Sequence, residues 1–455
     1  MILNSQCVMT EVLRLSNKRN LCLAYSGGVD SHVLLHLLAN WPQAERPKLN
    51  VIHIDHGLNP DSARWASHCK KTVEGLGLSC EVIKVEVTQV NELGLEAAAR
   101  QARYQAFKQR LTDQDCLLTA QHQQDQAETV LLQLFRGAGV RGLSAMKAVT
   151  DLAGLMVVRP LLNVTRDAIV AYAKHYQLAW LEDPSNGDVS LNRNFLRHQV
   201  MPLLVERWPA LSATLSRTAA HFGDAQQLLD ELAQADLRAA EVDWVAASVS
   251  ISGLRRINRQ RCANALRYWL HRLGFQAPST VHLERIINEV FNAAEDRQPL
   301  VHWHSVEVRR FQQRLYAMTT DDSQPQTLEI FDTREIAISN NMNLHWQAHA
   351  GAGMSLQIIQ SGLSLRYRSG GEKIQLAGHA CHHSLKKLFQ QWQIPAWRRQ
   401  HIPLLFAGDE LVAVVGYGWS EKYAVKGNET GWIATTQAGQ QTSFSLSDII
   451  DSGNL

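Results

Sequence analysis

The sequence lacks several patterns that would assign it to a class at once. No apolar run reaches membrane-spanning length, and no N-terminal stretch resembles a signal peptide. The seven cysteines are scattered and never form Cys-x-x-Cys, which argues against a zinc ribbon or a cysteine-held cluster. Reduced thiols are the simplest interpretation, so we expect a cytoplasmic protein.

Strong charge is missing as well. The 455 residues carry a formal net charge of only +2, so a nucleic-acid partner has to be sought in local patches. The apolar fraction of 45% and the charged fraction of 19% are those of an ordinary globular protein. A chain of this length is too long for one core, which predicts two to three domains.

The most informative feature present is the run Ser26-Gly27-Gly28-Val29-Asp30-Ser31. It lies between an apolar stretch typical of a buried strand (21–25) and one typical of a helix (32–38). Glycines let the main chain approach a phosphate, and a helix N-terminus points free N–H groups at it. For a Gly-Gly pair alone an ordinary tight turn is the usual interpretation. No Gly-Lys-Ser/Thr closes the run, so it is not a Walker A loop.

This six-residue run resembles the pyrophosphate loop of the N-type ATP pyrophosphatases, which split ATP into AMP and pyrophosphate. The resemblance implies that ATP binds here with Mg²⁺ and that the whole run, Ser26 to Ser31, contacts its phosphates. Asp55 and His56, which follow the next apolar strand, are expected at the mouth of the same site. A strand end followed by a glycine turn is the alternative interpretation of that pair.

Residues 20–205 alternate strand-like and helix-like stretches, which predicts an α/β fold with a parallel, Rossmann-like sheet covered on both faces. Ligands of such sheets bind at the carboxyl ends of the strands. We expect strands over 21–25, 49–54, 80–87 and 115–120, and helices over 61–76, 95–111, 125–135 and 165–176.

The pattern changes after this region, which we assign to a catalytic domain over 1–209. Residues 210–300 show helical periodicity without alternating strands, and we expect a separate helical domain there. Residues 301–455 form a small mixed α+β region with a core at about 355–435. Short strand-like stretches (305–318, 356–359, 363–367) and one helix (384–392) are expected in it. Residues 319–326 have the composition of a linker, and 435–455 are polar and aperiodic.

A third cluster of candidate residues lies in the stretch 119–129, where Asp125 and Glu128 share one face of a helix in its first turn. Helix capping is a common reason for such a pair. Two carboxylates at a strand's carboxyl end also suit Mg²⁺ or an ammonium group. We therefore take Asp125, together with Asp30, as a candidate metal ligand.

This stretch resembles a narrower family, the tRNA(Ile)-lysidine synthases, whose pattern has a His, two acidic residues and then Gln-x-Glu-Thr. The chain departs from it at Gln124, where the family usually has an Asp. Residues 95–104 resemble the family's Glu-Ala-Ala-Arg-x-x-Arg-Tyr helix, although an amphipathic surface helix would look alike. Residues 182–198 resemble its Asp-Pro-Ser-Asn and Arg-Asn-x-x-Arg elements, for which a turn and a helix start are the alternative.

The family resemblance implies a ligase that adenylates the wobble cytidine of an isoleucine tRNA with a CAU anticodon and then attaches L-lysine. It implies that ATP and Mg²⁺ are used. The sequence does not define the oligomeric state, and a homodimer is one alternative. The residues expected to carry the chemistry are Asp30, Arg100, Arg103, Asp125 and Glu128. Arg193 and Arg197 are expected to contact tRNA.

A local basic patch lies between residues 361 and 402. This segment contains seven Lys and Arg residues but only one acid, Glu372. Tyr367, Trp392 and Trp397 lie among these charges, and phosphate contacts with aromatic platforms are typical of RNA-binding surfaces. A solvated face is the usual alternative. The stretch also resembles the C-terminal domain of the same synthases, which implies tRNA binding by Lys386, Lys387, Arg398 and Arg399.

Three other activities compete with this interpretation. A cluster-binding tRNA thiolase would need Cys-x-x-Cys pairs, and a glutamine-dependent amidotransferase would need a glutaminase domain; neither is visible. A non-catalytic tRNA-binding protein with a degenerate nucleotide site is favoured only by Gln124.

Overall fold

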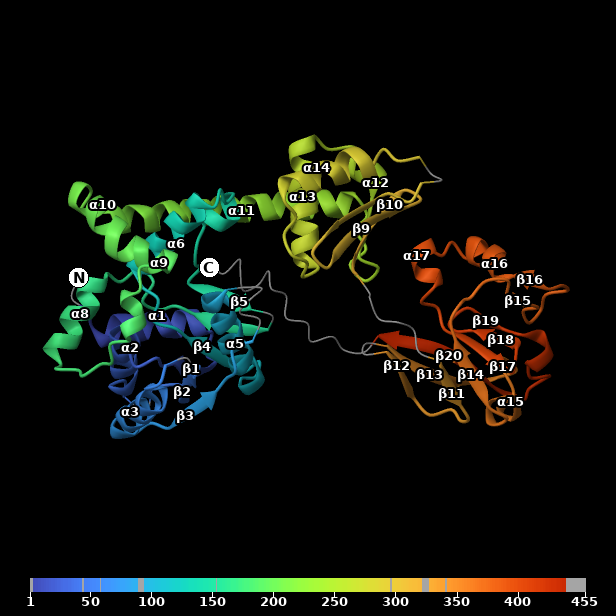
Figure 1. Ribbon diagram of the computed structural model, residues 1–455, viewed down its shortest axis with the longest axis horizontal. Helices are drawn as coiled ribbons and strands as arrows, with labels where there is room; N and C mark the ends of the chain where they lie inside the picture. Colours follow the sequence, from blue (N-terminus) through green and yellow to red (C-terminus); the bar gives the residue numbers. More distant parts are fainter. Residues whose placement is uncertain are drawn as a thin grey trace.

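The computed structural model describes residues 3–42, 45–57, 59–88, 94–152, 154–294, 297–320, 327–339 and 342–438. Three groups of elements follow one another along the chain (Figure 1), and hydrophobic cores form within each group. None of the helices in these ranges is both long and apolar enough to cross a membrane.

The N-terminal domain is built on a six-stranded sheet of order β3-β2-β1-β4-β6-β5. All neighbours are parallel except β5 and β6, which form an antiparallel hairpin. The strands are β1 (Asn20–Ala24), β2 (Leu49–Asp55), β3 (Cys80–Lys84), β4 (Asp115–Leu118), β5 (Val149–Leu152) and β6 (Leu155–Val158). The predicted α/β sheet is therefore confirmed. The hairpin was not expected from the sequence, because its strands are short and no helix separates them, so they break the alternation of strands and helices.

Helices cover both faces of this sheet, as expected. One core packs α1, α2, α3 and α8 on one face, and a second packs α5 on the other. The helices are α1 (Ser5–Ser16), α2 (Val29–Ala39), α3 (Ser62–Gly75), α5 (Leu95–Arg110), α6 (Gln123–Phe135), α7 (Val140–Leu143) and α8 (Arg166–His175). The first turns of α2 and α6 both lie at the carboxyl edge of the sheet, directly after β1 and β4.

A helical segment leads from this domain to the next. It comprises a 3₁₀ turn (Pro184–Gly187), α9 (Asn192–Phe195), a π-helical turn (Leu196–Val200), α10 (Met201–Arg207) and the long α11 (Leu211–Ala239). The helix α11 packs against α6 and α7 of the first domain and against α13 of the second (Figure 1). One continuous helix therefore joins the two domains.

The middle domain differs from the helical domain expected over 210–300. A four-stranded sheet of order β7-β10-β9-β8 shares one core with α11 and α13. Its strands are β7 (Ser248–Ser250), β8 (Leu300–Trp303), β9 (Val306–Phe311) and β10 (Arg314–Thr319); its further helices are α12 (Ile251–Leu254), α13 (Arg259–Arg272), α14 (Thr280–Arg285) and a π-helical turn (Ile286–Val290). A boundary at 300 would divide this core, so the strands over 305–318 belong here and not to the C-terminal region.

The C-terminal domain is a mixed α+β unit, as predicted. A five-stranded sheet contains β11 (Leu328–Ile330), β14 (Leu363–Arg366), β17 (Leu404–Ala407), β18 (Glu410–Val414) and β19 (Gly418–Trp419). A three-stranded sheet contains β12 (Ile336–Ser339), β13 (Met342–Ala350) and β20 (Thr430–Ala438), and a short pair joins β15 (Lys373–Ile374) to β16 (His383–Ser384).

Its helices are α15 (Leu356–Gln360), α16 (Leu385–Gln391), α17 (Ala396–Arg399) and a 3₁₀ turn (Glu421–Tyr423). The helix expected over 384–392 is confirmed as α16. The strand expected over 356–359 is helical instead, because four apolar-rich residues are too few to distinguish the two periods. Most of the expected linker (321–326) and of the polar tail (439–455) lies outside the described residues.

Candidate active site

The run 26–31 forms the tight turn between β1 and α2. Gly27 has a φ of +86°, and a Cβ there would lie 2.8 Å from Cys69 Sγ, so both conformation and space require glycine. Ser31 holds the turn closed: its hydroxyl accepts from the Ser26 N–H at 3.2 Å and donates to the Gly28 carbonyl at 3.0 Å. Gly28 is the N-cap of α2, so the free N–H groups of the first helical turn are available to an anion.

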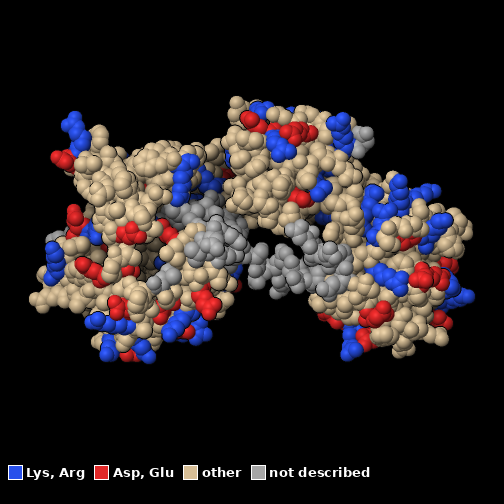
Figure 2. All heavy atoms as spheres, in the orientation of Figure 1, with Lys and Arg blue, Asp and Glu red and all other residues tan. Residues whose placement is uncertain are grey.

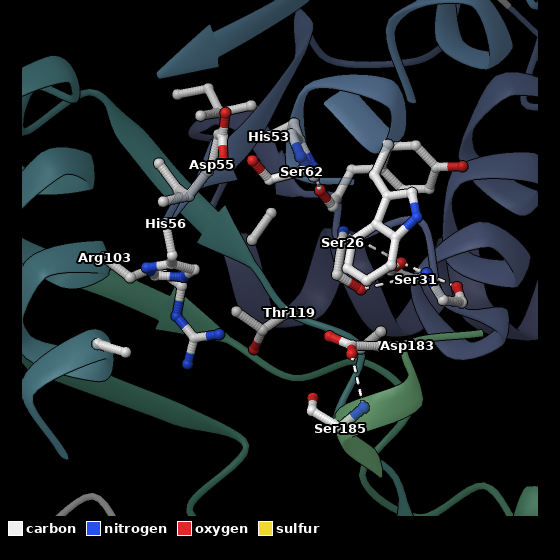
Figure 3. A pocket seen from close by; sticks show the side chains of 18 of the residues that line it. Ser26, Ser31, His53, Asp55, His56, Ser62, Arg103, Thr119, Asp183 and Ser185 are labelled. Atoms are coloured by element: carbon white, nitrogen blue, oxygen red, sulfur yellow. Dashed lines mark hydrogen bonds between the residues drawn. The ribbon is translucent and has the colours of Figure 1, made fainter. Parts of the chain in front are cut away.

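A cavity of about 630 Å³ opens at the carboxyl ends of β1, β2 and β4. Of the predicted phosphate-binding run, Ser26, Gly28, Asp30 and Ser31 line it, whereas Gly27 and Val29 complete the turn behind. Asp55 and His56 line it from β2. Figure 3 shows Arg103 and His56 together, across the cavity from Ser26 and Ser31, with Thr119 between the two groups.

His122 links the two candidate metal ligands. Its Nε2 atom lies 3.6 Å from Asp30 Oδ1 and 3.4 Å from Asp125 Oδ2. Its Nδ1 atom accepts from the backbone N–H groups of Gln124 and Asp125, which makes His122 the N-cap of α6. An accepting Nδ1 leaves the proton of the neutral ring on Nε2, so an N–H points at both carboxylates.

The two carboxylates differ in their electrostatic surroundings. Burial raises the pKa of Asp30, and the nearby charge of Asp125 adds to this effect. Burial would also raise the pKa of Asp125, but His122, Arg193 and Arg197 outweigh it and hold that pKa below its usual value. Asp125 is therefore firmly ionised, whereas Asp30 is an ionisable group held in an unfavourable environment.

Glu128, the second acid of the pair predicted from the sequence, does not share the position of Asp125 in the cavity wall. Glu128 is fully buried and does not line the cavity. Its carboxylate accepts from Arg197 at 2.7 and 2.8 Å and from Arg193 at 3.0 Å. Asp125 Oδ1 accepts from the same two arginines, at 2.9 and 3.1 Å. Glu128 is thus bound to the helical segment after the turn at Pro184.

Arg193 and Arg197 were expected to contact tRNA, but the structure places them in this four-residue ion-pair cluster. Only about a fifth of each side chain is exposed (18% and 21%). Burial would lower the pKa of Arg197, yet hydrogen bonds and charges from Glu128 and Asp125 raise it above its ordinary value. Their position supports a role in fixing Asp125 rather than in direct contact with RNA.

The helix α5 supplies the positive side of the cavity. Arg103 lines it, whereas Arg100 is buried and lines an adjoining cavity of about 240 Å³ with His56 and Glu96. Tyr104 lies beneath both guanidinium groups, whose central carbons are 4.7 and 5.7 Å from its ring centroid. Burial and the charge of Arg103 lower the pKa of His56 to about 4, so His56 is a neutral group of this site.

Three further residues at the site were not among those predicted to act there: the buried His122 and the lining residues Asp183 and Ser185. His122 precedes Asp125 by three residues, which is a capping-box spacing. Asp183 and Ser185 come from the Asp-Pro-Ser-Asn element and are joined by a hydrogen bond of 2.9 Å from Ser185 N to Asp183 Oδ1. Asp183 and Ser185 are more than 150 residues from the phosphate loop in the sequence, so the sequence alone did not indicate that they line the same cavity.

The predicted tRNA-binding residues of the C-terminal domain are not equivalent. Lys386 and Lys387 are exposed on α16, and Arg398 is exposed on α17. Arg399 is half-buried and donates from Nε to the Ile394 carbonyl at 2.8 Å. Figure 2 shows Lys and Arg side chains gathered over the part of this domain where Figure 1 places α16 and α17.

Comparison with family models matches residues 2–204 to the PP-loop domain, 250–316 to the TilS substrate binding domain and 363–436 to the TilS substrate C-terminal domain. The tRNA(Ile)-lysidine synthase of Coxiella burnetii is 41% identical to this chain over 430 residues, which cover 94% of the chain and 95% of that protein. That of Legionella pneumophila (strain Lens) is 38% identical, with 92% and 96% covered. A crystal structure of a TilS C-terminal domain aligns with 26% of this chain and 100% of its own, at 15% identity and a TM-score of 0.20. With family models and close relatives matched along most of its length, the chain belongs to the tRNA(Ile)-lysidine synthase family.

Proposed function

We propose that this chain uses ATP to attach L-lysine to the wobble cytidine of an isoleucine tRNA with a CAU anticodon, and so forms lysidine. ATP first adenylates the carbonyl oxygen at carbon 2 of the cytidine, and pyrophosphate leaves. The side-chain amine of lysine then attacks carbon 2 and displaces AMP. The observation that carries the proposal is the cavity in which the phosphate loop and Arg103 face one another, with Asp30 and Asp125 in its wall and the buried His122 between these two acids.

The loop and α5 would handle the phosphates from opposite sides. The backbone N–H groups at the start of α2 are free of helix partners and would stabilise the departing pyrophosphate. Arg103 lies across the cavity and would neutralise the phosphate of the adenylate. Arg100 is buried beside Tyr104 and would act by holding Arg103 and the α5 wall in place.

The site fits Mg²⁺ at Asp30. Oδ1 of Asp30 is buried in the wall of the cavity and has no hydrogen-bond partner, and Asp125 lies on the far side of His122. In the described ranges no three His, Cys, Asp or Glu side chains form a metal site by themselves. Mg²⁺ commonly takes one or two carboxylates and completes its shell with substrate phosphates and water. When bound, it would spread the negative charge of the pyrophosphate.

The lysine substrate would bind through its ammonium group on the acidic side of the cavity. Asp125 lines the cavity, and its neighbours hold its pKa below the usual value. Glu128 would act through Arg193 and Arg197 by fixing Asp125 in place. The amine must be neutral to attack, so a carboxylate of the cavity would accept its proton.

We assign the catalytic step to the N-terminal domain and tRNA binding to the C-terminal domain. The middle domain connects these two domains. Lys386, Lys387 and Arg398 are the exposed cations that support phosphate contacts. Because the substrate is tRNA, a cytoplasmic location follows. A homodimer stays a prediction, to be measured by the mass of the particle in solution.

The alternative of a degenerate, non-catalytic nucleotide site is not favoured. Gln124 lies in the first turn of α6, where its backbone N–H donates to His122 Nδ1 at 3.2 Å, and this contact does not depend on its side chain. The deciding experiment incubates purified protein with ATP, lysine and tRNA transcripts, then analyses the nucleosides by mass spectrometry. Lysidine is expected with the isoleucine tRNA and not with a methionine tRNA that shares the CAU anticodon. Absence of lysidine, with pyrophosphate released at the rate of a tRNA-free control, would overturn the proposal.

A further inference from the structure

Trp397 of the C-terminal domain lies against the middle domain. Its ring centroid is 6.1 Å from that of Phe311 and 5.8 Å from that of Tyr316, both with edge-to-face geometry. The guanidinium carbon of Arg309 lies 5.6 Å from the same Trp397 ring. Trp397 is thus held by two aromatic rings and one cation, and all three come from another domain.

The three partners form one face of the β9–β10 hairpin. Arg309 and Tyr316 are directly opposite each other in the antiparallel register, and Phe311 lies two residues beyond Arg309 on the same face. Val308 and Arg310, the two sequence neighbours of Arg309, are buried on the opposite face, where Val308 belongs to the core shared with the helices. The sheet therefore has one face packed on its own core and one face that meets Trp397.

Both sides of this contact are held in place. Glu307 accepts from Arg309 Nε at 2.8 Å and lies on the same face, which orients the guanidinium group. Trp397 lies in α17, which begins after the extended Pro395, and Ile394 before it belongs to the C-terminal core. The neighbouring Arg399 donates to the Ile394 carbonyl and braces the same segment. A shift of Trp397 would therefore shift the domain that carries it.

We infer that Trp397 is a positioning residue that docks the C-terminal domain on the middle domain, and that it is not an aromatic platform for an RNA base. The contact continues the rigid connection that α11 makes between the catalytic and middle domains. It would hold the exposed cations Lys386, Lys387 and Arg398 at a fixed distance from the cavity. One tRNA could then be bound at both places without the loss of effective concentration that a loose tether causes. The inference rests on the proposed function for its tRNA readout alone.

The test uses the full-length protein with Trp397→Ala, Arg309→Ala and the double variant. Phe331→Ala is the matched control, since Phe331 is a 61% exposed aromatic residue of the same domain. In small-angle X-ray scattering without tRNA, Trp397→Ala is expected to increase the radius of gyration, and the control is not. Trp397→Phe keeps a ring for the cation and the aromatic partners and should largely restore the compact particle.

The kinetic readout separates positioning from folding. Trp397→Ala should raise the KM for tRNA about tenfold, equivalent to about 1.4 kcal/mol, while ATP binding and kcat at saturating tRNA stay near wild type. Arg309→Ala should act in the same direction from the other domain, and the two effects should not add in the double variant. Unchanged scattering, or a wild-type KM in Trp397→Ala, would overturn the inference. If the wild type makes no lysidine, the proposed function fails. The scattering measurement without tRNA would still show whether Trp397 docks the C-terminal domain on the middle domain.

Discussion

Nε2 of His122 lies 3.6 Å from Oδ1 of Asp30, so the residue that caps α6 also faces the first acid of the phosphate loop. The two helix starts at the carboxyl edge of the sheet are thereby linked through one imidazole. Asp125 lies on the other side of the same ring, at 3.4 Å. His122 therefore combines the capping of α6 with a position between two acids of the cavity.

Asp30→Ala is expected to abolish adenylation and leave the fold intact, because Asp30 lies at a helix start and its Oδ1 atom accepts no hydrogen bond in the cavity wall. Loss of charge stabilisation at such a position typically costs about 100-fold or more in rate. Pyrophosphate release with tRNA present measures the effect, and circular dichroism checks the fold. Wild-type release by the purified variant would contradict the assignment.

Asp30→Asn should make the folded protein more stable at neutral pH. Burial raises the pKa of Asp30 above 3.8, so ionisation costs stability as the pH rises through 3.8 toward the raised folded-state pKa. The wild type therefore loses part of its stability on going from acid to neutral pH, and the variant should lose less. Thermal unfolding over a pH series measures this; identical profiles for both proteins would show that burial does not strain Asp30.

His122→Asn tests the contact with Asp30 separately from the cap. Asparagine is a good N-cap, so the unfolding free energy should change by less than about 1 kcal/mol. It cannot reach both carboxylates, so adenylation should still fall at least tenfold. His122→Ala removes the cap as well and should cost about 1 kcal/mol more. Full activity in His122→Asn would limit His122 to capping.

Asp125→Asn and Glu128→Gln should both reduce lysidine formation by orders of magnitude, for different reasons. Asp125 lines the cavity, whereas Glu128 neutralises Arg193 and Arg197 from a fully buried position. Glu128→Gln should therefore also destabilise the fold, by about 3 kcal/mol, because two largely buried cations lose one of the two carboxylates that they share. Gln124→Ala is the control and should be mild. Equal losses of activity in all three variants would show that the acidic pair is misassigned.

Charge reversal of Lys386 and Lys387 should weaken tRNA binding and flatten its salt dependence, with ATP binding nearly unchanged. Reversal of Arg398 and Arg399 should do the same but also loosen the local fold, since Arg399 donates to the Ile394 carbonyl. Arg398→Glu alone is the cleaner variant. Filter binding across a salt series measures the effect. Wild-type affinity and salt slope in every variant would identify the patch as a solvated face.

The phosphate loop and the α/β sheet were predictable because their information is local. A strand, a glycine turn and a helix start are consecutive in 20–39, and hydrophobic spacing alone defines strands buried under helices. The basic segment 361–402 was also visible, since charge composition needs no fold. In contrast, the hairpin β5–β6 and the strands β7–β10 were missed or misplaced, because short strands are defined by the partners with which they pair.

What the sequence determined by itself was therefore the type of site and the edge of the sheet that carries it. Only the tertiary structure decided which side chains are free to act there. Arg193 and Arg197 follow Glu128 by 65 and 69 residues, and their ion pairs exist only because α9 and the turn after it fold back onto α6. Trp397 likewise changed from a candidate RNA platform to a domain contact, because its partners Phe311 and Tyr316 lie on a separate domain. The pattern of a chain specifies local geometry, but the partner of a charge or a ring is set by long-range packing.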